Sequence, residues 1–134
     1  MSSTNIDYVN NYFEYPVLTK IHGEPKYASL RTMEDEIKAN ASSVSTTLGG
    51  GHHGHLGLTM LTADYTPGVA PVPYVRPVHP GPLVIPAGTT QHEATRRRED
   101  HRAAVKLFRE TVDVEKALLK QIDFQGEIQK RVQI

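Results

Sequence analysis

The chain has 134 residues and no cysteine, and its 15 basic residues balance 15 acidic ones. A neutral chain has no long-range attraction for nucleic acid or for an acidic membrane surface, and a chain without cysteine forms no disulfide, cysteine zinc site or catalytic thiol. Apolar residues make up 38%, below the usual globular share. We therefore expect a thin core that burial in a neighbouring subunit would stabilise.

The N-terminus has no basic segment followed by an apolar one, so no signal peptide is visible. No apolar run approaches the roughly 20 residues of a membrane span. We expect a cytoplasmic protein without a membrane partner, although an assembled particle or filament could be released.

Residues 1–28 are predicted to form an extended arm, because Pro16 and Pro25 interrupt helix and Gly23 adds a turn. The arm carries four aromatic side chains, which we assign to a subunit interface: Tyr8, Tyr12, Phe13 and Tyr15. They pack either on the domain's own helices or on a neighbouring subunit, and the sequence leaves both alternatives open.

A first helix is predicted over residues 29–46. Its apolar residues recur at steps of three and four: Leu30, Met33, Ile37, Ala41 and Val44. Ser29 is the expected N-cap, and Gly49 ends the helix. The apolar stripe is narrow, so the helix should pack against one or two others and not be surrounded.

Glycine and histidine dominate the next stretch. Its glycines allow a tight turn and a close approach of backbones: Gly49, Gly50, Gly51, Gly54 and Gly57. Its histidines are His52, His53 and His55. Residues 56–63 follow without helical caps, and we expect extended chain or a short strand there.

Residues 64–88 carry seven prolines, which exclude helix and disfavour a central strand. A polyproline-like extended conformation remains. The segment is too apolar for a solvated linker, so it must lie in a groove on its own helices or on those of another subunit. The residues assigned to a subunit interface are Val72, Tyr74, Val75, Val78, Leu83, Val84 and Ile85.

A second helix is predicted over residues 90–125. It begins at a capping box formed by Thr90 and Glu93. Two apolar sets with a spacing of four are offset from each other, which predicts a bend or break near residues 111–113, and Gly126 is the expected end. From these sets we assign Phe108 and Leu118 to the subunit interface. The fold class is therefore mostly α with little or no β, in one domain over residues 29–134.

No motif recommends an enzyme, a cofactor or a small-molecule substrate. The glycines match G-x-G-x-x-G, but without the strand before and the helix after that nucleotide binding requires. His52, His53 and His55 are too close in sequence for a helix-borne zinc site. A fourth ligand would come from one of four other histidines, and no spacing singles one out: His22, His79, His92 and His101. We therefore predict no metal, with the three clustered histidines as the only candidates.

Nucleic acid is a second alternative. Residues 96–98 are all arginine, and Arg102, Lys106 and Arg109 extend a basic stripe along the second helix. Acidic residues interrupt the stripe, which favours a salt-bridged solvent face. The stripe has neither aromatic residues nor a zinc knuckle.

Several stretches resemble the opening of Gag-like regions in Copia-type retrotransposon polyproteins of algae, diatoms and other protists. They are residues 21–27, 36–44, 48–58, 75–82, 107–110 and 114–118, with the glycine–histidine run and His79-Pro80-Gly81-Pro82 the most distinctive. The resemblance implies a capsid-type structural module that assembles with copies of itself. The family's polyprotein continues through more helices, a zinc knuckle and enzymes, whereas this sequence stops at Ile134. A free-standing fragment of this kind would form another assembly, such as a tube or filament.

We therefore expect a non-enzymatic structural protein whose partner is itself, with its extended segments buried on adjacent subunits. The alternative is a histidine-based metal-binding module or a weak nucleic-acid-binding module.

Overall fold

The computed structural model describes residues 8–65 and 72–132, with the backbone alone at residue 63 and over 126–132. In chain order the elements are helix α2 (Tyr27–Ser43), the 3₁₀ turns η1 (Leu48–Gly51) and η2 (Leu56–Leu58), the short helix α3 (Thr62–Tyr65) and the long helix α4 (Gln91–Val132). The described residues contain no strand. The mostly α fold with two main helices is therefore confirmed.

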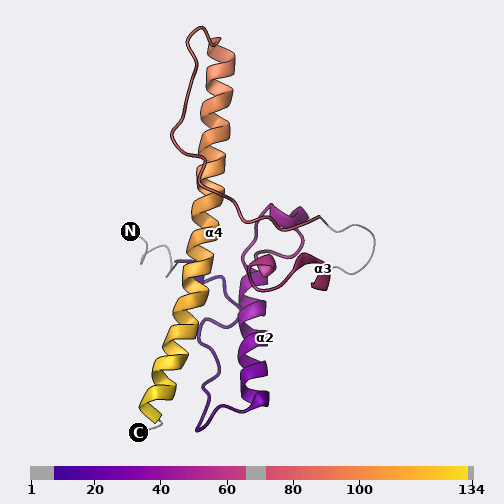
Figure 1. Ribbon diagram of the computed structural model, residues 1–134, viewed down its shortest axis with the longest axis vertical. Coiled ribbons are helices and arrows are strands. Elements are labelled where there is room, and N and C mark those ends of the chain that lie inside the picture. Colours follow the sequence, from indigo (N-terminus) through magenta and orange to yellow (C-terminus); the bar gives the residue numbers. More distant parts are fainter. Residues whose placement is uncertain (1–7, 66–71, 133–134) are drawn as a thin grey trace.

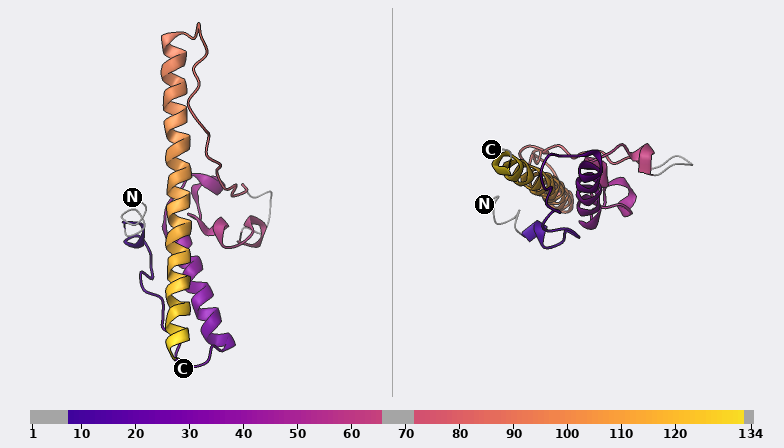
Figure 2. Two further views of the ribbon diagram at one scale, coloured as in Figure 1. Left: turned by 60° about the vertical axis from the view of Figure 1, so that its left-hand side comes forward. Right: turned by 90° about the horizontal axis from the view of Figure 1, so that it is seen from below.

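Helix α4 is the axis of the molecule. Its 42 residues correspond to a length of about 63 Å at 1.5 Å per residue. Helix α2 runs antiparallel beside its C-terminal half, and the extended segment 72–86, called the strip below, lies beside its N-terminal half (Figure 1). The turned view shows the same two neighbours (Figure 2). The part of the predicted Pro-rich segment over 66–71 lies outside the described residues.

A small core lies where α2, α4 and the N-terminal arm meet. It consists of Val9, Phe13, Leu18, Ile37, Ala41, Val114, Ala117 and Leu118, with Met33, Val44 and Leu58 packed against it. The arm supplies three of the buried side chains, so it covers the domain's own helices. Phe13 and Leu118, which we assigned to a subunit interface, are instead buried inside the chain.

Buried amide side chains hold the arm in place. The fully buried Asn40 accepts a hydrogen bond from the Tyr15 N–H at 2.7 Å and donates to the Tyr15 carbonyl at 2.9 Å. It also donates to Gln121 Oε1 at 2.9 Å, and Gln121 Nε2 donates to the carbonyls of Tyr15 and Pro16. One turn further on, Gln125 donates to the Thr19 carbonyl at 2.7 Å. These side chains satisfy backbone groups that extended chain would otherwise bury without partners.

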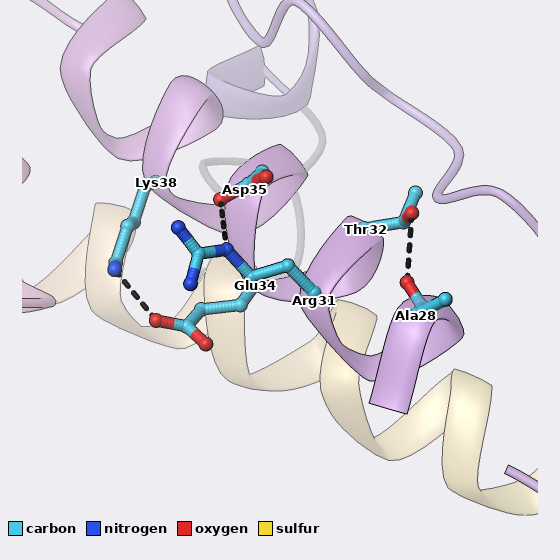
Figure 3. Close-up of polar contacts among 6 residues, drawn as sticks. All are labelled: Ala28, Arg31, Thr32, Glu34, Asp35 and Lys38. Carbon is cyan, nitrogen blue, oxygen red and sulfur yellow. Dashed lines mark hydrogen bonds and ion pairs between the residues drawn. The ribbon is translucent and has the colours of Figure 1, made fainter. Parts of the chain in front are cut away.

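The outer face of α2 carries ion pairs one turn apart. Lys38 Nζ lies 2.6 Å from Glu34 Oε1, and Arg31 Nε lies 3.4 Å from Asp35 Oδ1 (Figure 3). Each pair joins opposite charges at i and i+4, so this face is solvated and close to neutral.

The first helix begins and ends earlier than predicted. Lys26 is its N-cap, and Ser29 lies inside the first turn, where its hydroxyl accepts from the Lys26 N–H at 2.9 Å. Ser29 is therefore the wrong N-cap, although it does satisfy a backbone donor. The helix stops at Ser43 because Val44 is extended, whereas residue 46 was expected.

Helix α4 continues without a break through residues 111–113 and beyond Gly126, so the predicted break and the predicted end were wrong. The Thr111 hydroxyl donates to the Leu107 carbonyl at 2.9 Å, a bond that a continuous helix accommodates. The offset between the two apolar sets has another cause: Phe108 faces the strip, while Val114 and Leu118 face the core. The predicted start is confirmed, with the Glu93 N–H donating to Thr90 Oγ1.

Residues 56–63 are not extended. The turn η2 and the first residues of α3 occupy this stretch. The Thr59 hydroxyl and N–H both bond back to the Leu56 carbonyl, a local closure that competes with extended chain. The predicted strand is therefore wrong.

Replacing Asn40 with alanine should lower the free energy of unfolding by about 3 kcal/mol, because buried groups of Tyr15 and Gln121 lose their partners. Urea unfolding followed by circular dichroism measures the change. The exposed Asn11→Ala is the control, with an expected effect within about 0.5 kcal/mol. Equal effects of the two substitutions would contradict the role given to Asn40.

Candidate functional site

The glycine–histidine stretch forms a socket for Tyr74, the first aromatic residue of the strip. A Cβ added at Gly57 would overlap the Tyr74 ring, and one at Gly54 would overlap the Ser42 carbonyl at the end of α2. The Tyr74 N–H donates to Thr62 Oγ1 at 2.9 Å. The expected close approach of backbones is present at Gly54, within one chain, whereas at Gly57 the close neighbour is the Tyr74 side chain. The space left by the absent Cβ of Gly57 accommodates the Tyr74 ring, which positions the strip.

His55 forms the part of the socket that contacts the Tyr74 hydroxyl. It is fully buried, and its Nδ1 lies 2.8 Å from the Tyr74 hydroxyl. Its Nε2 has no hydrogen-bond partner in the described part of the chain. Burial lowers the pKa of His55 to about 4 and raises the pKa of Tyr74 to about 12, although a hydrogen bond with Thr111 acts against the latter shift. Both groups are therefore neutral at neutral pH, so the socket buries no charge.

Three contacts, at regular intervals along α4, hold the strip against that helix. The two terminal guanidinium nitrogens of Arg76 lie 2.6 and 2.8 Å from the two carboxylate oxygens of Glu115. The His79 ring meets the Phe108 ring edge to face, with centroids 5.2 Å apart. The Gly81 carbonyl accepts from His101 Nε2 at 2.7 Å.

The α4 partners of the strip are seven residues apart. Positions 101, 108 and 115 return to nearly the same side of a helix, with a drift of about 20° per seven residues. The strip therefore follows one face of α4, running against the direction of that helix. His79 also stabilises the backbone of the strip, since its Nδ1 accepts a hydrogen bond from the Gly81 N–H at 2.9 Å.

The strip has an inner and an outer side. Tyr74 and Pro77 are half-buried, whereas Val72, Val75 and Val78 are 60%, 66% and 83% exposed. The spacing of three matches an extended polyproline-like chain, which takes three residues per turn. The three valines, called the valine stripe below, lie on the exposed side of the strip, and Val72 also borders Gly50, whose added Cβ would lie 3.5 Å from it.

The other assigned interface residues fall into two groups. Exposed side chains are Tyr8, Tyr12, Tyr15, Leu83 and Val84, and half-buried ones are Tyr74, Ile85 and Phe108. Of the half-buried group, Tyr74 and Phe108 have the partners inside the chain described above. Tyr8 and Tyr12 form a hydrogen bond with each other, with their hydroxyl oxygens 2.6 Å apart.

The clustered histidines do not converge. His52 is exposed, His53 lies against the Tyr65 ring at 5.0 Å, and His55 faces Tyr74. Over residues 8–65 and 72–132, no three His, Asp or Glu side chains are placed to hold a metal ion. Within the same ranges no helix has the length and apolar character to cross a membrane.

Part of the basic stripe lines an open groove on α4. Arg98, Arg102 and Arg109 lie along it, with His101 between them and Leu83 of the strip at its edge. Lys106 also lines it and lies 4.0 Å from Glu110. The groove could contact phosphate groups, but Glu110 and Asp113 also line it, and its lining includes no Phe, Tyr or Trp ring for base stacking.

Sequence reasoning gave Arg76 and Glu115 no role, and it weighed His101 only as a possible fourth ligand of a metal site that it did not predict. It weighed His79 in the same way and otherwise noted it in the family resemblance. The spacing of seven between positions 101, 108 and 115 was the signal that could have found them, since it marks one face of a helix. Comparison with protein-family models, curated proteins and solved structures finds no match to this chain.

Substituting Gly57 with alanine should expel Tyr74 from its socket, since the new Cβ has no room. Limited chymotrypsin digestion then cleaves after Tyr74 at least about tenfold faster, a change of about 1.4 kcal/mol. Gly51→Ala is the control for backbone strain alone, because residue 51 has a φ of +79° but its added Cβ would lie 3.6 Å from its nearest neighbour and would not clash. Equally fast cleavage in both variants would show that the socket does not hold the strip.

The free energy of unfolding should fall between pH 6.5 and about 4. The pKa of His55 is about 4 in the fold and about 6.5 in an unfolded chain, so the unfolded state binds more protons in this window. His55 then contributes a slope of up to about 1.4 kcal/mol per pH unit. Urea titrations of the protein and of His55→Gln measure it. The difference in free energy of unfolding between the protein and His55→Gln should become smaller as the pH falls. A difference that does not change with pH would contradict a lowered pKa of His55.

Proposed function

We propose that this protein is a non-enzymatic building block that assembles with copies of itself. The observation that carries the proposal is the valine stripe, an apolar surface held rigidly at the outside of the molecule. Val78 at its end is 83% exposed, and the contacts of Tyr74 and Arg76 prevent the strip from turning it inward. A pre-ordered apolar strip loses little entropy when it binds.

The size of the chain supports the same proposal. The described core contains few large side chains, and the first turns of α4 have only the strip beside them (Figure 1). A helix with so little cover gains stability from a further layer. A capsid-type module, a tube and a filament are all forms that this building block could take.

Nucleic-acid binding is the second candidate, on the evidence of the groove with Arg98, Arg102 and Arg109. The whole chain is neutral, so any such contact would be weak and sensitive to salt. We rank it below self-assembly because the valine stripe carries no charge.

Sedimentation velocity of nuclease-treated protein tests the proposal. We expect a mass that rises with concentration above the 14.9 kDa of the monomer, both in 0.1 M and in 1 M NaCl, because salt screens charges but does not weaken apolar contacts. A monomer at every concentration and salt would refute it. Assembly that untreated protein shows but nuclease-treated protein does not, or that 1 M NaCl abolishes, would favour the nucleic-acid alternative.

A further inference from the structure

An apolar groove lies open between α2 and the C-terminal half of α4. It encloses about 530 Å³, and its walls include Leu30 and Met33 of α2, Leu119 and Ile122 of α4, and Leu58 of η2. Leu30 and Leu119 are 46% and 52% exposed. The arm fills the opposite side of the helix pair, where Asn40 and Gln121 bind it, so no described segment covers the groove.

The groove continues the face of α4 to which the strip binds. Positions 101, 108 and 115 contact the strip, and the next position at a spacing of seven is Ile122, on the groove wall. The strip starts beside Glu115, so it leaves Ile122 uncovered. The same face of one helix is thus occupied by extended chain along its first part and open along its last.

The valine stripe has the shape and chemistry of an occupant. Val72, Val75 and Val78 would follow one another at about 9 Å, three residues of 3.1 Å each, along a polyproline-like chain. Extended Pro-rich segments bind in apolar grooves because they are already ordered. On its own molecule the stripe cannot reach the groove, since the socket and Glu115 fix the strip with the valines outward.

Charge favours a neutral apolar partner over a polyanion. On the α2 wall of the groove Lys38 pairs with Glu34, and outside the groove lining Arg31 pairs with Asp35 (Figure 3). On the α4 rim Glu115 is neutralised by Arg76, which is also the only charged residue of segment 72–78. Both surfaces are therefore close to neutral, and two copies meet without net repulsion.

We propose that the groove binds the valine stripe of a second copy, so that subunits join head to tail. The proposal rests on the proposed function and specifies its contact. The stripe and the groove are different surfaces of one molecule, so the interface is heterologous, and each added subunit presents a new stripe and a new groove. The assembly is then an open filament or tube, or a ring where the rotation closes.

Mixing two complementary variants tests the interface. The stripe variant carries Val75→Glu and Val78→Glu and keeps its groove; the groove variant carries Leu30→Glu and Leu119→Glu and keeps its stripe. Each alone should sediment as a monomer at concentrations where the unsubstituted protein assembles. A 1:1 mixture should form a dimer of twice the monomer mass and stop there, because the free ends of that dimer are a disabled stripe and a disabled groove.

Val17→Glu is the matched control. Val17 is an exposed apolar residue of the N-terminal arm, away from both the stripe and the groove, so its substitution should leave assembly unchanged. Circular dichroism confirms that each variant keeps its helices. If the unsubstituted protein assembles but the mixture stays monomeric, or if either variant assembles alone, the head-to-tail contact is wrong while self-assembly stands. If the unsubstituted protein is a monomer throughout, the proposed function itself fails.

The absence of native cysteine permits a second test that does not depend on disrupting the interface. Val78→Cys and Leu119→Cys proteins, mixed and oxidised, should form a disulfide between different copies. Val78→Cys mixed with Val17→Cys should form several-fold less. Equal yields from both mixtures would overturn the proposed contact.

Discussion

The strip along α4 is a single extended chain, and a single extended chain has two sides. One side faces the helix, with Tyr74 in its socket and His79 against Phe108. The other side must face away, and here it carries valine at every third position from 72 to 78. Val75 and Val78 therefore stay largely exposed in the described part of the chain. In the account proposed above, a further surface covers them.

Ordering of the strip precedes any association. The socket, the Arg76–Glu115 pair and the bond from His101 to Gly81 fix its backbone within one molecule. The entropy lost on fixing a segment usually opposes its binding, and here folding has already absorbed that loss. The glycine–histidine stretch seats Tyr74, and in the assembly that we propose it would act indirectly, by keeping the valines exposed.

Sequence reasoning found what local chemistry determines. Periodicity located both long helices, Thr90 marked the start of α4, and the prolines excluded helix from the strip. It failed where a choice depends on distant partners. Gly126 lies inside a helix because a single interior glycine costs only about 1 kcal/mol, and the offset of the apolar sets reflects two neighbours, the strip and the core. For Phe13 the sequence left interface and core open, and it assigned Leu118 to an interface; the three-dimensional arrangement buries both in the core.

The central claim is that a second copy covers the outward valines. Hydroxyl-radical footprinting, read by mass spectrometry at a series of protein concentrations, measures their solvent exposure directly. The account predicts that Val72, Val75 and Val78 become protected as the concentration rises, together with Leu119 of the groove, while Val17 keeps its reactivity. Unchanged reactivity of the valines across the concentration range would contradict it.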